Sequence, residues 1–129
     1  MLGLLDIFGR AESLKSLDLA LREFDVHPRI VPEAVKLATV RLLKNASGAD
    51  SKLPDAAYTS AAEMLSYCLL GPDQFVASNT LNAAKHAEHR LEKAIAAGNG
   101  LEVDLILLAL HSGVIHTKIA DRFDVETSE

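Results

Sequence analysis

The sequence contains one cysteine, no tryptophan and only six Phe and Tyr residues among its 129. With Cys68 alone, no disulfide can form within the chain, so an oxidising compartment would add nothing to the stability of the fold. Cys68 falls in line with Ala57, Ala61 and Met64 on a predicted helix, which is typical of a small buried residue rather than of a reactive thiol. We therefore expect a cytoplasmic protein.

Long apolar segments and a surplus of basic residues are also missing. The longest unbroken apolar run is Leu105–Leu110, far shorter than the roughly 20 residues that span a bilayer. The segment Met1–Arg10 lacks the basic start and the longer apolar stretch of a signal peptide. The formal net charge is -5, from 13 basic and 18 acidic residues, which disfavours the phosphate contacts that dominate nucleic-acid affinity. We expect neither a membrane span nor a nucleic-acid partner.

The residues that are present favour helices. Nearly half of the chain is apolar, carried by Leu, Ala, Val and Ile, and the length suits one domain. The most apolar segment, Leu101–Leu110, is the only one short and apolar enough to be taken for a strand. Because no second segment could pair with it, we expect a helix, placed at the centre of the fold. Between positions 73 and 97 we expect either one long helix or a short turn followed by a helix from about position 80. Apolar periods and Pro or Gly punctuation predict further helices at about 13–25, 32–45, 54–70 and 115–123. The sequence thus predicts an all-α single domain over 1–129, an irregular or up-down bundle of five to six helices.

The helix predicted at 32–45 is apolar on two sides. Positions 31, 35, 38 and 42 line one side, while Leu37 and Val40 fall on the opposite side. Extra apolar surface on a small domain is typical of a contact with another protein. We therefore assign Leu37, Val40 and Leu43 as a candidate interaction face and expect a homo-oligomer, formed here or through Leu2–Phe8, or a contact with a protein partner. This predicts a non-enzymatic interaction module with no cofactor and no catalytic residues.

The alternative is a helical enzyme that binds a small molecule or a metal. Helical bundles hold metals with Glu-x-x-His pairs, but the sequence has no such pair, no His-Glu-x-x-His and no second cysteine. His111 ends a helix, where a cation interacts well with the helix dipole, and His116 follows shortly after. If these histidines converged with Glu63 or Glu88, they could act as a general acid and base. The alternative ligand or metal site is therefore Glu63, Glu88, His111 and His116.

Two other histidines stand on one helix face. His86 and His89 are three residues apart, which places both side chains on the same side. That side lies opposite the apolar stripe through Ala84 and Leu91, so we expect both histidines on a solvated face. Glu88 borders the stripe, and we expect it to pair with a base on a neighbouring helix.

The run Ile119-Ala-Asp-Arg-Phe-Asp-Val125 resembles the positioning helix and turn of helix-turn-helix DNA-binding proteins. The resemblance covers seven residues, and too few follow them for the recognition helix that enters the major groove. The residues after Phe123 are also largely acidic. We interpret the run as a short amphipathic helix that packs Ile119 and Phe123 on the core.

Overall fold

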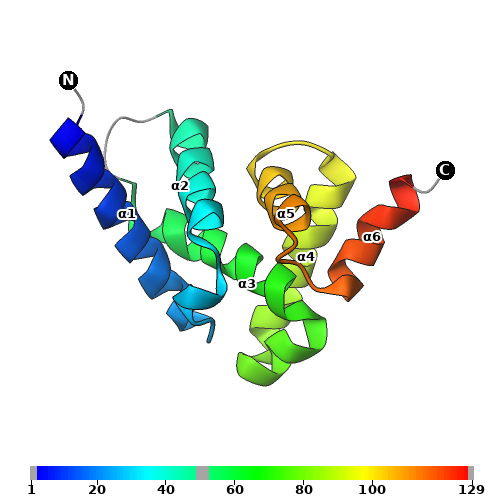
Figure 1. Ribbon diagram of the computed structural model, residues 1–129. Coiled ribbons are helices and arrows are strands. Elements are labelled where there is room, and N and C mark those ends of the chain that lie inside the picture. The colour runs from blue at the N-terminus through cyan, green and yellow to red at the C-terminus, as the bar shows by residue number, and fades with distance from the viewer. Residues whose placement is uncertain (1–2, 49–52, 128–129) are drawn as a thin grey trace.

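The computed structural model describes the backbone of residues 3–48 and 53–127, and the side chains of residues 11–48 and 53–122. The described residues form helices and no strand, so the predicted all-α class is confirmed (Figure 1). The elements in chain order are α1 (Gly3–Glu23), the 3-10 turn η1 (Pro28–Ile30), α2 (Glu33–Ser47), α3 (Asp55–Ser78), α4 (Leu81–Ala97), α5 (Leu101–Ser112) and α6 (Thr117–Thr127).

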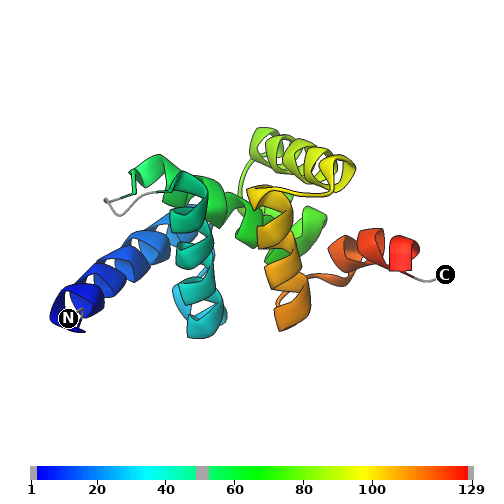
Figure 2. The same ribbon diagram turned by 90° about the horizontal axis from the view of Figure 1, so that it is seen from above.

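Helix α3 is the centre of the structure. It contacts each of the other five α-helices, with α1 and α2 on one side and α4, α5 and α6 on the other (Figures 1 and 2). All eight residues from Ala61 to Cys68 are buried, which requires neighbours around the whole helix. The expectation that Leu101–Leu110 is central was wrong, because Asp104 is exposed and Leu107 and Leu108 are only half-buried.

The Gly71-Pro72 pair breaks α3 into two parts. Gly71 has φ 83° and ψ 167°, a conformation that is essentially restricted to glycine. The predicted stop after Leu70 is therefore present, but the chain enters a second helical part at once and continues to Ser78. The hydroxyl oxygen of Thr80 then accepts a hydrogen bond from the Ala83 N–H at 3.0 Å and caps α4. Of the two alternatives for positions 73–97, a fresh helix near position 80 is present, but the residues before it are helical to Ser78 rather than a short turn.

The first and last helices extend beyond their predicted bounds. The α1 backbone is helical from Gly3 rather than from about position 13; the side chains of Leu2–Phe8 lie outside the described residues. Helix α6 packs Ile119 on the core with none of its surface exposed, as predicted, while the Phe123 side chain lies outside the described residues. Among the described residues, no single helix is long and apolar enough to cross a membrane; α4 and α5 meet that requirement only as a pair bent by 97°.

Candidate functional site

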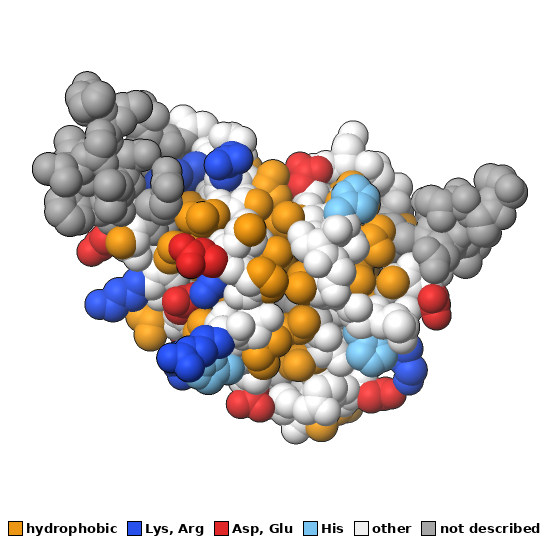
Figure 3. Space-filling model, in the orientation of Figure 1, with side chains coloured by type: hydrophobic (Ala, Val, Ile, Leu, Met, Phe, Trp, Pro, Cys, Tyr) orange, Lys and Arg blue, Asp and Glu red, His pale blue; other side chains and the backbone are white. Residues whose placement is uncertain are grey.

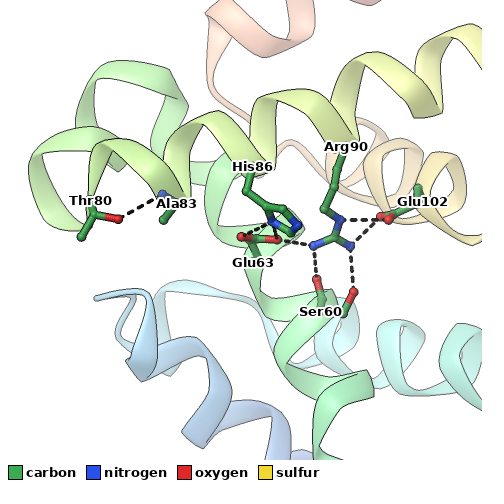
Figure 4. A network of polar contacts seen from close by, with 7 residues as sticks. All are labelled: Ser60, Glu63, Thr80, Ala83, His86, Arg90 and Glu102. Carbon is green, nitrogen blue, oxygen red and sulfur yellow. Dashed lines mark hydrogen bonds and ion pairs between the residues drawn. The ribbon is translucent and has the colours of Figure 1, made fainter.

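A charged network joins α3, α4 and α5 (Figure 4). The Arg90 guanidinium lies 2.5 Å from a carboxylate oxygen of Glu63 and 2.7 Å from one of Glu102. Its Nε also donates to Glu102, and its remaining N–H groups donate to the backbone carbonyl and the hydroxyl of Ser60, both at 2.9 Å. All five donors of the guanidinium are therefore engaged. The Arg90 and Glu63 side chains are only 12% and 10% exposed, so the network links three helices around largely buried charges.

The charge of Arg90 is maintained by its partners. Burial alone lowers the pKa of Arg90, but the hydrogen bonds to Glu102 and Glu63 outweigh it and leave the pKa above its ordinary value.

The positions of the network residues follow from helical spacing. Ser60 and Glu63 are three residues apart on α3, and His86 and Arg90 are four apart on α4. Each pair therefore presents neighbouring side chains to the facing helix.

His86 also contacts the Glu63 carboxylate. Its Nδ1 lies 2.9 and 3.0 Å from the two carboxylate oxygens, while 65% of the His86 side chain remains exposed. The predicted exposure to solvent is present for His89. His86 is also exposed, but the prediction did not include its contact with Glu63. A helical wheel gives the direction of a side chain from its own helix and omits the neighbouring helix within its reach.

A second network fastens α6 to α3 and α4. The Tyr67 hydroxyl donates to Glu88 at 2.5 Å, and Arg122 of α6 donates to both carboxylate oxygens of Glu88 at 2.9 and 2.7 Å. The hydrogen bond from Arg122 holds the pKa of Glu88 below its ordinary value. Burial and Glu88 raise the pKa of Tyr67 well above its usual range, so the phenol remains a donor. The predicted pairing of Glu88 with a base on a neighbouring helix is present.

His116 holds the start of α6 against the break in α3. Because Pro72 has no N–H, it cannot donate to the Cys68 carbonyl as an α-helix requires. The His116 backbone N–H donates to that carbonyl instead, at 2.7 Å. The His116 ring fills the space where a side chain on Gly71 would begin. The Cys68 thiol is fully buried, as predicted, and burial raises its pKa to about 12.

The four residues of the alternative ligand or metal site do not form one site. Glu63 belongs to the Arg90 network, Glu88 belongs to the Arg122 network, and His116 packs on Gly71. His111 is exposed in the last turn of α5, near the carbonyl end of the helix. Within the described residues, no hydrogen bond or ion pair joins two of the four, and no group of three His, Cys, Asp or Glu side chains could hold a metal ion.

The assignment of Leu37, Val40 and Leu43 as one exposed face requires correction. Val40 and Leu43 are only 6% and 4% exposed and belong to the core, while Leu37 is half-buried. Helix α2 is apolar on two sides because it packs between two neighbours, α1 and α5. At Val40 and Leu43, the apolar side chains are therefore explained by contacts within the chain rather than by a contact with another molecule.

Sequence patterns alone do not assign Arg90, Tyr67 and Arg122 to a site. One signal points to Arg90: Glu63 stands within the short run Ala61–Leu65, whose other residues are all apolar. A buried carboxylate requires a cationic partner, and Arg90 is an arginine on the next helix. Nothing in the sequence alone places Arg122 beside Glu88, because that contact depends on how α6 folds back.

Comparison of the chain with known proteins gave no match. No family model, no curated protein and no solved structure resembles it significantly. The function is therefore argued from the contacts and surfaces of this chain.

Proposed function

We propose that the chain is a cytoplasmic, non-enzymatic interaction module that forms a homodimer through the surface shared by α2 and α5. The observation that carries this proposal is the outer side of α5. Eight of the 12 residues of α5 are apolar, yet only Val103, Leu105, Ile106 and Ala109 are buried. A helix that is apolar on nearly all sides is normally covered on all sides. Leu107, Leu108 and Leu110 are half-buried instead. Leu107 and Leu108 pack in part against the core and lie on either side of exposed Asp104.

The neighbouring helix extends this surface. Figure 3 shows hydrophobic side chains gathered in the middle of the face, between α2 and α5, and α2 contributes half-buried Leu37. Apolar surface that continues across two helices favours association with another protein more than single exposed leucines do. Of the predicted interaction residues, Leu37 stays available to such a contact, whereas Val40 and Leu43 do not.

The charges beside this surface favour a second copy as the partner. Helices α2 and α5 lie side by side in opposite directions (Figures 1 and 2), so the last turns of α2 lie beside the first turn of α5. Arg41, in the middle of α2, and Asp104, in the first turn of α5, are both exposed. A two-fold axis parallel to the helices and between them brings α2 of one copy against α5 of the other. Each copy then places its Arg41 close to the partner's Asp104.

The charged groups of the interior also fit a structural role. Glu63 and Glu88 each pair with an arginine from another helix, and such pairs fix how helices meet. An interaction module needs a rigid surface on which its contacts are already arranged.

The experiment compares two aspartate substitutions by size-exclusion chromatography with light scattering. Leu108→Asp places a charge within the proposed interface and is expected to give a folded monomer. Leu81→Asp is the matched control, because Leu81 is 58% exposed in the first turn of α4, where an acidic residue is tolerated. The control is expected to dimerise as the natural sequence does. Equal association of Leu108→Asp and the natural chain would refute the interface.

A further inference from the structure

A hollow of about 630 Å³ opens beside the Arg90 network. It is bounded by the end of α1, the first half of α3 and α4, and its lining includes Phe24, Thr59 and His86. Phe24 is fixed in two ways: its ring stacks on that of Phe75 with centroids 6.2 Å apart, and its carbonyl accepts a hydrogen bond from the Asn79 side chain at 3.1 Å. The hollow therefore has one aromatic wall that is already held in place.

His86 also lines the hollow, and the roles of its two ring nitrogens follow from its contact with Glu63. The Glu63 carboxylate lies beside the charged Arg90 guanidinium and acts only as an acceptor. Because both of its oxygens are within 3.0 Å of His86 Nδ1, Nδ1 must carry the hydrogen. A neutral His86 then has its lone pair on Nε2. Among the described residues Nε2 has no hydrogen-bond partner. The His86 side chain is 65% exposed, and the residue lines the hollow.

The charges around the hollow decide which ligands fit. An anion would need a free cationic donor, but all five N–H donors of Arg90 are already engaged. The nearby carboxylates of Glu63 and Glu102 also disfavour an anion. What the hollow offers instead is one acceptor nitrogen and one aromatic wall. These suit a neutral molecule with a ring and a hydrogen-bond donor.

We propose that this hollow is a binding site for a small neutral aromatic molecule that carries an O–H or N–H group. The ring packs on Phe24, and the donor group bonds to Nε2 of His86. Glu63 is a positioning residue that holds His86 in the tautomer with a free Nε2, and Arg90 holds Glu63. The lining of the hollow comes from the end of α1 and from α3 and α4, whereas the proposed dimer uses α2 and α5, so the two proposals are tested separately.

The first test measures the tautomer. Long-range proton–nitrogen NMR spectra of the histidine-labelled protein, recorded at about pH 8.5 where an imidazole is neutral, distinguish the two ring nitrogens. We expect His86 to carry its hydrogen on Nδ1, whereas exposed His89 and His111 serve as internal references without a carboxylate partner. A His86 ring with its hydrogen on Nε2 would overturn the proposal.

The second test uses phenol and anisole as probes, because they share a ring and differ in the O–H donor. Phenol is expected to shift the signals of Phe24 and of His86 Nε2, and to bind about fivefold more tightly than anisole, the contribution of one hydrogen bond. His86→Phe keeps a ring at this position but removes the acceptor, so it should abolish the preference for phenol. His89→Phe is the matched control on the same helix and should preserve it. Equal affinity for phenol and anisole, no shift at Phe24, or a preference that survives in His86→Phe would each overturn the proposal.

Discussion

Gly71→Ala is expected to destabilise the fold where α6 meets α3, for two separate reasons. Gly71 has φ 83° and ψ 167°, and a side chain in that region costs about 1–3 kcal/mol. A Cβ on Gly71 would also lie 2.6 Å from Cγ of His116 and 2.7 Å from its Cδ2. Displacing a packed ring costs a further 1–3 kcal/mol or so. We expect a total loss of about 3 kcal/mol or more, a large part of the stability of a small domain.

A double-mutant cycle separates the two costs. The free energy of unfolding is measured by urea denaturation for the natural chain, Gly71→Ala, His116→Ala and the double variant. His116→Ala removes the ring but keeps the backbone N–H that donates to the Cys68 carbonyl. In that background Gly71→Ala should cost only the backbone strain, about 1–3 kcal/mol. An unchanged cost in the two backgrounds would show that the ring does not pack on Gly71, and a cost below about 1 kcal/mol would refute the backbone conformation.

Two further predictions concern the charged networks. Arg90→Met should lower the free energy of unfolding by about 3 kcal/mol, because it leaves the Glu63 carboxylate, 10% exposed, without its cation; a loss below about 1 kcal/mol in urea denaturation would contradict this. The pKa of Glu88 is lowered in the folded chain by the hydrogen bond from Arg122. Its stabilising effect is therefore complete above the ordinary glutamate pKa and is lost as the pH falls through the lowered value. Urea denaturation between about pH 6 and pH 3 should show a weaker pH dependence in Arg122→Met than in the natural chain; equal dependence would contradict the pairing.

Much of the local structure could be predicted from the sequence. The break at Gly71-Pro72 and the Thr80 cap depend on residues close in the chain, and both are present. The start of α1 at Gly3 could not be predicted in the same way. The residues at the start of α1 have no single apolar stripe, and a helix is predicted from sequence mainly by such a stripe.

The candidate site was less predictable because its contacts join distant helices. The apolar pattern of α2 predicts a free surface at Val40 and Leu43, because a wheel drawn for one helix does not show that α1 and α5 cover both sides of α2. The carboxylate of Glu63 makes it a candidate ligand residue in the sequence. Its partner Arg90 is 27 residues away, and only the packing of α4 on α3 brings the two together. Burial of a carboxylate can be inferred from a sequence, but the identity of its partner requires the tertiary structure.

The most direct test of the proposed dimer is a charge exchange measured by sedimentation equilibrium. Arg41→Glu and Asp104→Arg should each weaken association, since each places like charges opposite one another across the two-fold axis. The two substitutions together restore opposite charges and should recover most of the affinity of the natural chain. That recovery, with a mass twice that of the chain, is the result that the proposed homodimer predicts. A natural chain that sediments as a monomer at every concentration, or a double variant no better than either single variant, would contradict it.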